Sequence, residues 1–139
     1  MKTFLDSGVL LAAWKRGEWH DRAAAILEDD SREFVTCENV QLELLPKPTF
    51  EKRHLEVRFY NEHFTQTTGC EPFSDALGKT AMALAKKHGL AAGDALNLAS
   101  AMRQGADEFI TSELPGKPVF RVSQIKVISL HSLVPSSER

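Results

Sequence analysis

Acidic residues occur at four points of the chain that a parallel sheet would bring together. Asp6 and Glu113 each follow a short apolar segment, and Asp94 opens a run of small and apolar residues. Glu43 shares one face of an expected helix with Val40. Carboxylate oxygens are the ligands that hard divalent cations prefer, and such cations activate water and relieve charge on a phosphate. If the four acids converge, they could hold such a cation.

Each acid also has a structural explanation that the sequence leaves open. Asp6 is a favoured residue type for a helix N-cap, and Asp94 in a first helical turn complements the helix dipole. Glu43 can lie at the edge of an apolar stripe or pair with a basic side chain. Glu113 can be a solvated loop acid. The combination of the four positions, more than any one of them, favours a shared site.

Strands and helices are expected to alternate along the chain. The segments expected to be extended are residues 2–5, 33–36, 70–73, 108–111 and 125–129. Segment 70–73 contains a proline, which predicts an edge strand. The alternation predicts a mostly parallel sheet covered on both faces, a three-layer α/β/α sandwich. Chemistry in such sheets gathers beyond the carboxyl ends of the strands, where Asp6 and Glu113 are expected.

Apolar periodicity and capping residues predict six helices. They cover residues 9–14, 20–28, 37–45, 50–64, 75–88 and 94–104. Thr36 is expected to cap the third helix, and Ser74 the fifth. Leu55 is expected on the inward face of the fourth helix. Gly89 suits the left-handed end of the fifth helix.

Length and composition indicate one ordinary globular domain. The 139 residues are expected to form a single domain over residues 1–134, with a flexible tail at 135–139. Hydrophobic residues make up 42% and charged residues 26% of the chain, as in soluble proteins. The net charge of −2 argues against a protein that binds nucleic acid by phosphate contacts alone. It is weaker evidence against a metallonuclease, whose clustered acids are neutralised by bound cations.

Cysteine usage and hydropathy point to the cytoplasm. Cys37 and Cys70 form no CxxC pair and no spaced Cys/His set, which argues against a zinc site. No apolar stretch approaches the roughly 20 residues that span a bilayer, so no membrane association is expected. Without a signal-peptide pattern, two reduced thiols in a cytoplasmic protein are the expectation. The absence of GxxxxGK[ST] and GxGxxG patterns leaves nucleotide binding unsupported.

Four blocks of sequence, in order and covering nearly the whole chain, resemble the PIN-domain family, which includes the VapC-type toxins of toxin–antitoxin pairs. The most specific block is Leu90-Ala-Ala-Gly-Asp-Ala-Leu-Asn-Leu-Ala-Ser-Ala101, built on Asp-Ala. The other three are Phe4-Leu-Asp-Ser-Gly-Val-Leu-Leu11, Val40-Gln-Leu-Glu-Leu-Leu45 and Gly105-Ala-Asp-Glu-Phe-Ile-Thr-Ser-Glu113. The resemblance implies the same fold, a parallel sheet between helical layers.

The resemblance also assigns residues to the family's site. Asp6, Glu43 and Asp94 take the three principal acidic positions, and Ser7 takes the hydroxyl position. Glu113 stands where the family usually has Asp in a Thr-x-Asp pattern, which moves its carboxylate by about one bond and adds a methylene. Further polar contacts are expected from Thr111, whereas the Gly8 position, which often holds Ser or Asn in the family, lacks one.

The activity implied is metal-dependent endoribonuclease cleavage of RNA, in a VapBC-type toxin. Asp6 and Asp94 are expected to bind Mg²⁺ or Mn²⁺, and Glu43 to bind the ion directly or to orient the attacking water. Glu113 is expected to support a second ion or the water shell, and whether one ion or two bind stays open. The resemblance further implies a homodimer and a small antitoxin protein as partner.

Contacts to RNA are expected from a local basic rim. The candidates are Lys15, Arg16, Lys47, Lys52, Arg53 and Lys117. For each of them simple solvation is the competing explanation. Trp14 and Trp19 fit a core or an interface better than a base-stacking platform.

Other classes of protein fit less well. A catalytically silent module with the same fold, binding RNA or a small antitoxin-like partner, stays open because Glu113 departs from the family pattern. A response-regulator receiver domain needs paired acids after its first strand, and a haloacid-dehalogenase-like phosphatase needs Asp-x-Asp there. Neither pattern is present at Asp6-Ser7-Gly8.

Overall fold

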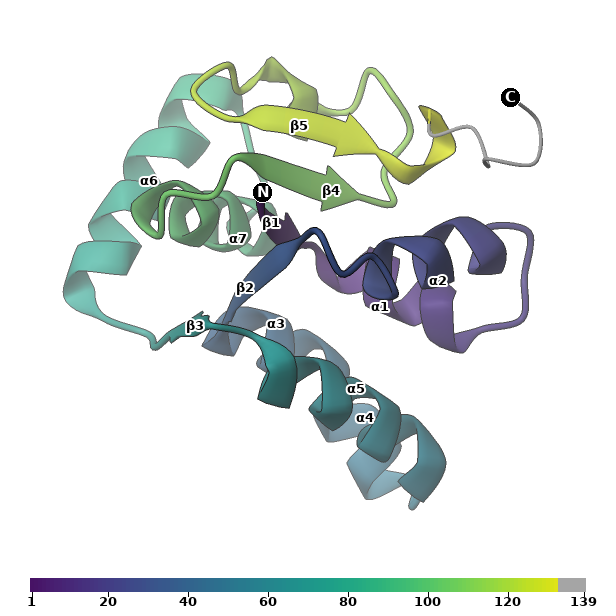
Figure 1. Cartoon of the computed structure of the whole chain (residues 1–139). Coiled ribbons are helices and arrows are strands. Elements are labelled where there is room, and N and C mark those ends of the chain that lie inside the picture. Colours follow the sequence, from purple (N-terminus) through teal and green to yellow (C-terminus); the bar gives the residue numbers. More distant parts are fainter. Residues whose placement is uncertain (133–139) are drawn as a thin grey trace.

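Five short apolar segments form one all-parallel sheet in the computed structural model, which describes residues 1–132. The strands are β1 (Lys2–Leu5), β2 (Glu33–Cys37), β3 (Gly69–Glu71), β4 (Glu108–Thr111) and β5 (Lys126–Ser129). Their order in the sheet is β3-β2-β1-β4-β5, with β3 at an edge as its proline-containing surroundings predict (Figure 1). Because every pair is parallel, the carboxyl ends of all strands lie at one edge of the sheet.

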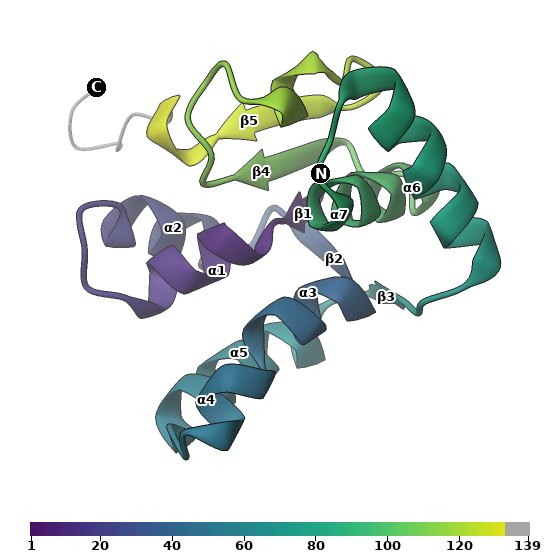
Figure 2. The same ribbon diagram turned by 180° about the vertical axis from the view of Figure 1, so that it is seen from behind.

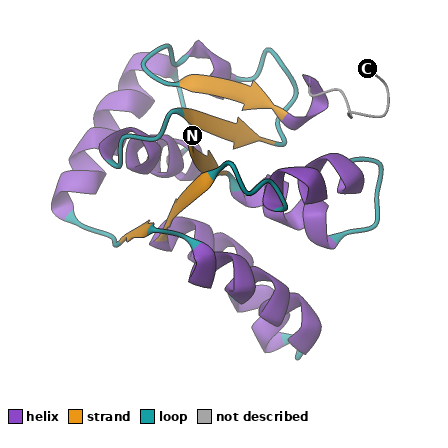
Figure 3. Cartoon of the chain, in the orientation of Figure 1, coloured by secondary structure: helices purple, strands orange, loops and turns teal. Residues whose placement is uncertain are grey.

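Seven α-helices surround this sheet in the described residues. They are α1 (Ser7–Trp14), α2 (His20–Leu27), α3 (Glu38–Leu44), α4 (Pro46–Phe50), α5 (His54–Gln66), α6 (Asp75–His88) and α7 (Ala92–Arg103). The pair α6 and α7 covers one face and the pair α1 and α2 the other, while α3 to α5 extend beyond the β2–β3 end of the sheet (Figures 2 and 3). The expected three-layer sandwich is confirmed. The tail expected at 135–139 lies outside the described residues.

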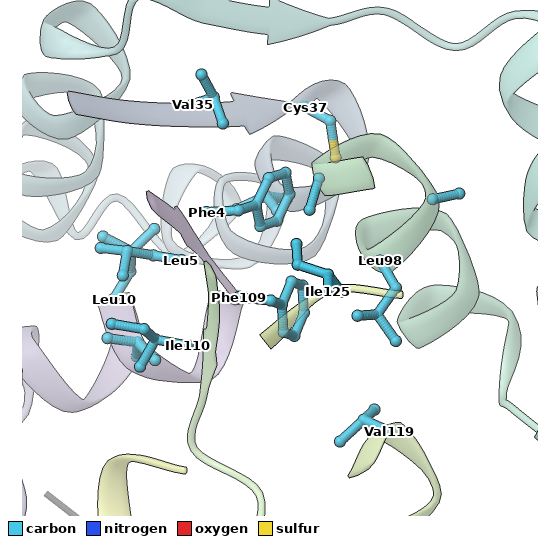
Figure 4. Packing of buried hydrophobic residues seen from close by; sticks show 14 of the residues in the cluster. Phe4, Leu5, Leu10, Val35, Cys37, Leu98, Phe109, Ile110, Val119 and Ile125 are labelled. Atoms are coloured by element: carbon cyan, nitrogen blue, oxygen red, sulfur yellow. The ribbon is translucent and has the colours of Figure 1, made fainter. Parts of the chain in front are cut away.

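Side chains of the central strands alternate between the two faces, as extended backbone requires. Phe4 and Phe109 stack with ring centroids 5.5 Å apart and lie on the side of Leu98 in α7 (Figure 4). Leu5 and Ile110 lie on the opposite side, against α1. All five side chains are fully buried, so the sheet is fixed between two apolar layers and its carboxyl edge is held rigidly.

Three of the expected helix ends are confirmed. The carboxylate of Asp6 caps α1 by accepting from the backbone N–H of Ser7, and the Ser74 hydroxyl caps α6 by accepting from the N–H of Leu77 at 3.0 Å. Gly89 ends α6 with φ of 68°, the left-handed region where a Cβ is unfavourable. These three ends depend on residues close in sequence, which explains why they were predictable.

Three expectations for the segment from β2 to α5 are wrong. Thr36 lies within β2, and Cys37 takes the N-cap position of α3 without a side-chain capping hydrogen bond. The predicted helix over residues 50–64 is two helices, because Lys52 adopts a φ of 58° between α4 and α5. Leu55 is 67% exposed, and the buried face of α5 is formed one position later, beginning at Glu56.

Glu56 can be buried because its charge is partnered on both oxygens. It accepts a hydrogen bond from the Tyr60 hydroxyl at 2.7 Å and forms an ion pair with Arg53 at 3.1 Å. The polar Glu56, and not the apolar Leu55, therefore lies on the buried face of α5. None of the helices in residues 1–132 has both the length and the apolar character needed to cross a bilayer.

Candidate active site

The carboxylate of Asp6 lies at the carboxyl end of β1, where this strand meets α1. It is 6% exposed and accepts three hydrogen bonds. Oδ1 accepts from the Ser7 backbone N–H at 2.9 Å and from the Asn97 amide at 3.0 Å, and Oδ2 accepts from the Thr111 hydroxyl at 3.1 Å. All three donors are neutral, so they orient the carboxylate without cancelling its charge.

Asn97 of α7 links two of the predicted acids and was missed from the sequence. Its side chain is fully buried, and its amide donates to Asp6 and also to Oε1 of Glu43 at 2.8 Å. Its own oxygen accepts from the Asn39 amide at 3.0 Å and from the Cys37 thiol at 3.4 Å. Every polar atom of this side chain is used, so the spacing of the two carboxylates is fixed by a buried network.

The signal for Asn97 was present in the sequence. It lies three residues after Asp94, on the same helical face, and it interrupts a run of small and apolar residues. An amide in such a run either costs desolvation energy or has a partner. Asn39 lies one turn before Glu43 on the same face of α3, although polar residues surround it and the sequence around it carries no such signal.

Glu43 reaches the site from α3, where its side chain is exposed and close to the first turn of α7. A Cβ added to Gly93 would lie 3.1 Å from Oε2 of Glu43. That distance is tighter than ordinary van der Waals contact, so the glycine leaves room for the Glu43 carboxylate beside the first turn of α7. Asp94, the next residue, is half-buried in the first turn of α7.

The four acids act on one another electrostatically. Burial, and after it the charges of Glu43 and Asp94, together raise the pKa of Asp6 to about 6. Burial also raises the pKa of Asp94, and the charges of Glu113 and Glu43 add smaller increases. Within residues 1–132, none of the four carboxylates forms an ion pair with a lysine, arginine or histidine. The site is therefore a concentration of negative charge that no basic side chain of residues 1–132 pairs with.

The loop that carries Glu113 is held by its backbone. The N–H of Glu113 donates to the Thr111 hydroxyl at 3.2 Å, and its carbonyl accepts from the Ser129 hydroxyl at 2.7 Å. The loop is thus fixed between β4 and the end of β5. Ser7, in contrast, contributes to the site through its backbone N–H, as the bond to Asp6 shows.

The negative charge of the site suits a hard dication. The side chains, however, are not arranged so that several carboxylates could bind one ion. In the part of the chain that the structure describes, no three His, Cys, Asp or Glu side chains are grouped so as to hold a metal. The Asn97 amide stands between Asp6 and Glu43 instead. Four carboxylates, unpaired and with raised pKa values on Asp6 and Asp94, are nevertheless the donor set that Mg²⁺ and Mn²⁺ prefer.

The predicted basic rim is only partly available. Lys15, Arg16, Lys47, Lys52 and Lys117 are exposed. Arg53 is also exposed but forms ion pairs with Glu51 and Glu56, each at 3.1 Å. These two ion pairs already neutralise the Arg53 guanidinium, so Arg53 is a weaker candidate for an RNA contact than the lysines.

An all-parallel α/β/α sandwich with acids gathered at the carboxyl edge is the architecture that the four sequence blocks predicted. The PIN-domain family model matches residues 3–113. Because this match covers most of the chain, the protein belongs to the PIN-domain family. A search of curated proteins gave no match.

Solved structures share this fold at low sequence identity. VapBC2 from Rickettsia felis, bound to a DNA fragment of its promoter, has a TM-score of 0.69 at 15% identity, over 93% of this chain and 98% of the other. A toxin-antitoxin complex from Klebsiella pneumoniae has a TM-score of 0.65 at 17% identity, over 94% and 99%. VapC20 of Mycobacterium tuberculosis, a toxin that cleaves the Sarcin-Ricin loop, has a TM-score of 0.62 at 16% identity, over 89% and 98%.

The raised pKa of Asp6 predicts a pH-dependent loss of stability in metal-free protein. The folded state keeps the Asp6 proton up to about pH 6, against 3.8 for the ordinary carboxyl. Its contribution to stability is therefore complete below about pH 4 and is lost as the pH rises through about 6. Urea unfolding in chelator is expected to show wild type losing about 2 to 3 kcal/mol relative to Asp6→Asn between pH 4 and pH 7. Parallel pH profiles for the two proteins would contradict this account of Asp6.

Proposed function

We propose that the protein is a metal-dependent endoribonuclease. The observation that carries this proposal is the set of four carboxylates, Asp6, Glu43, Asp94 and Glu113, that share one electrostatic environment without a cationic partner in the described residues. Clustered unpaired acids are costly in a folded protein and are retained where they serve a bound cation or a reaction. Members of the PIN-domain family are generally nucleases, which supports the same reading.

The side chains divide into those that would hold a metal and those that position them. Asp6 and Asp94 would bind Mg²⁺ or Mn²⁺, and Glu43 would bind it or accept a hydrogen bond from the attacking water. A bound cation supplies an activated water and neutralises charge on the phosphate. Asn97 and Thr111 hold the Asp6 carboxylate in a fixed orientation, and Asn97 sets its spacing from Glu43.

Glu113 has a supporting role in this proposal. Its carboxylate raises the pKa of Asp94, so it lies within electrostatic reach of the proposed ligands. Its backbone is fixed by Thr111 and Ser129, which limits how far the longer side chain can adapt. Glu113 would therefore orient water or assist a second ion, and the number of ions is left to measurement.

The choice of RNA and of a toxin role is supported by the similar structures. One of them, VapC20, is a toxin that cleaves the Sarcin-Ricin loop, and another is a toxin-antitoxin complex. We infer that this chain is the cytoplasmic toxin of such a pair, with a small antitoxin protein as partner and a homodimer as its working form. Incubation with structured and single-stranded RNA is expected to give cleavage with Mg²⁺ or Mn²⁺ and none with chelator.

Metal binding is expected to stabilise the fold. A cation that binds only the folded protein adds about 2.7 kcal/mol at a hundredfold excess over its Kd, so Mn²⁺ is expected to raise the Tm by about 5 °C or more. Asp6→Asn is expected to remove most of this shift. Asp30→Asn, which removes an exposed carboxylate elsewhere, serves as the matched control and is expected to keep it. An equal shift in all three proteins would place the metal outside the proposed site.

A catalytically silent module is the second candidate, and one observation favours it. The Asn97 amide satisfies Asp6 and Glu43 without a metal, as a purely structural polar network would. Such a module would bind RNA or a small antitoxin-like partner. RNA degradation or growth arrest that persists unchanged in Asp6→Ala and Asp94→Asn variants would favour this candidate over the nuclease.

A further inference from the structure

A small cavity adjoins the acid cluster on the α1 side of the sheet. It has a volume of about 240 Å³ and lies between α1, the turn that follows α1, and the loop after β4. Two of its lining residues connect it to the site. Gly8 is two positions after Asp6, and Ser112 lies between Thr111, which donates to Asp6, and Glu113. Three larger hollows lie against α5 or along α6. Neither they nor this cavity are lined by any of the four site acids, and this cavity is connected to the site through Gly8 and Ser112.

The cavity combines a flat aromatic wall with an apolar floor and polar groups. Trp19 forms the aromatic wall, and Leu11 and Ala12 of α1 contribute apolar surface. Lys15 can donate hydrogen bonds and Glu18 can accept them. An aromatic ligand with donors and acceptors along its edge matches this lining better than a purely apolar ligand or a simple anion does.

His131 contacts both Trp19 and the loop that carries Ser112. The His131 ring packs edge-on against Trp19, with centroids 4.1 Å apart, and its ring nitrogen donates to the Ser112 carbonyl at 2.8 Å. The guanidinium of Arg22 lies 4.8 Å from the centre of the Trp19 ring and also donates to the His131 carbonyl at 3.1 Å. Trp19 is therefore fixed before any ligand arrives, which lowers the entropy cost of stacking on it.

Gly8 is required for this arrangement. A Cβ at this position would lie 1.9 Å from the Ser112 hydroxyl oxygen, a distance that no real contact reaches. The glycine thus allows the Ser112 side chain to lie against α1 at the border between the cavity and the acids. His131 lies beyond residues 3–113, the segment that matches the family model, so this wall of the cavity depends on a part of the chain outside that match.

We propose that the cavity receives one nucleobase of the RNA, adjacent to the phosphate that is cut. This inference rests on the proposed ribonuclease function and identifies part of its substrate recognition. A nucleobase stacks on a tryptophan whatever its sequence, and its edge carries the donors and acceptors that Lys15 and Glu18 complement. The cavity is smaller than the roughly 300–1,000 Å³ of sites for drug-sized ligands, which fits a single base. The shared Gly8–Ser112 border then directs the attached phosphate toward Asp6.

Binding of RNA by an uncleaving protein tests the inference without relying on catalysis. Fluorescence anisotropy would measure the Kd of single-stranded RNA octamers of each base for the full chain carrying Asp6→Asn. On this background, Trp19→Ala is expected to weaken binding about tenfold, since stacking on one aromatic residue contributes about that factor or more. Trp19→Phe is expected to restore most of the loss. Trp14→Phe is the matched control, because Trp14 packs on Phe59 and is not part of the cavity lining.

A second variant guards against a folding defect in Trp19→Ala. Ala12→Leu fills the cavity while leaving Trp19 in place, and it is expected to weaken RNA binding to a similar extent. Octamer affinities unchanged in both Trp19→Ala and Ala12→Leu would overturn the inference. Loss in both variants, with full affinity in Trp14→Phe, would support it.

Cleavage assays distinguish failure of this inference from failure of the proposed function. If the otherwise wild-type chain cuts RNA with Mn²⁺, and Trp19→Ala and Ala12→Leu cut at the same positions with the same KM, the base site is refuted and the nuclease stands. If octamers bind in a Trp19-dependent manner but no metal supports cleavage, the base site stands and the nuclease is refuted.

Discussion

Asparagine in place of Asp6 is expected to lower metal-dependent RNA cleavage by at least about a hundredfold while leaving the fold intact. The substitution keeps the shape of the side chain, and its oxygen can still accept from Thr111 or Asn97. It removes the negative charge that a dication requires, and loss of a group that handles charge or protons in the transition state costs about 10²–10⁴ in rate. The site is then present but cannot hold its ion.

Activity and stability are expected to change in opposite directions in this variant. The ionised Asp6 is disfavoured by burial and by two neighbouring acids, which is why its pKa rises to about 6. At neutral pH and without metal, the neutral asparagine relieves that repulsion, so Asp6→Asn is expected to unfold at an equal or higher urea concentration than wild type. A variant that lost activity because it was misfolded would unfold earlier.

The measurement is RNA cleavage with Mn²⁺ beside urea unfolding in chelator, for wild type, Asp6→Asn and the surface control Asp30→Asn. The control is expected to match wild type in both assays, because Asp30 is exposed and lies outside the acid cluster. Cleavage by Asp6→Asn at the rate of wild type would contradict the role assigned to this carboxylate.

Aspartate in place of Asn97 is expected to destabilise the metal-free protein by about 3 kcal/mol at neutral pH. The Asn97 amide donates to two carboxylates, and hydrogen bonds to charged groups contribute about 1.5–3 kcal/mol each. The new carboxylate would lose both donated bonds and face Asp6 and Glu43 as like charges. Its pKa in the folded protein would be raised, so the loss of stability is expected to be small at low pH and to grow as the pH rises.

Gln104→Glu is the matched control for this substitution. Gln104 is an amide at the C-cap of α7, and it donates to the Thr36 carbonyl at 2.7 Å and the Ser100 hydroxyl at 3.0 Å, away from the four acids. Mn²⁺ is expected to stabilise Asn97→Asp, where a fifth carboxylate joins the cluster, more than it stabilises Gln104→Glu, which keeps the wild-type acids and is expected to show the wild-type shift. Equal stability of Asn97→Asp and wild type at neutral pH would contradict the bridging role of Asn97.

The elements that were predictable from sequence are those determined by neighbouring residues. The strands follow from short apolar runs, and the cap at Ser74 and the stop at Gly89 involve residues within one turn. The prediction of a single helix over residues 50–64 was wrong because apolar periodicity does not report the backbone conformation of Lys52 or the burial of the Glu56–Tyr60 pair. Propensity describes a helix, whereas packing decides which face it buries.

The sequence identified which acids could form the site, but not how their side chains are arranged in space. Asp6 and Asp94 were visible because acids at a strand end and a helix start are local signals. The link between Asp6 and Glu43 depends on Asn97 of α7, which lies 91 and 54 residues from them in the sequence. Trp19 was interpreted as a core or interface residue, and only its position beside the site suggests a role in base stacking. Contacts between residues this far apart in the sequence depend on how the strands and helices are ordered in the fold, which local sequence patterns do not show.

The most direct test of the shared site is the position of Mn²⁺ in crystals of the protein, located by its anomalous scattering. The account predicts an anomalous peak among the carboxylates of Asp6, Glu43 and Asp94, with Glu43 released from Asn97 to reach the ion. The peak is expected to be absent in Asp6→Asn crystals treated in the same way. A saturating soak of the wild type that leaves this position empty, or that places manganese only at other acids, would contradict the account.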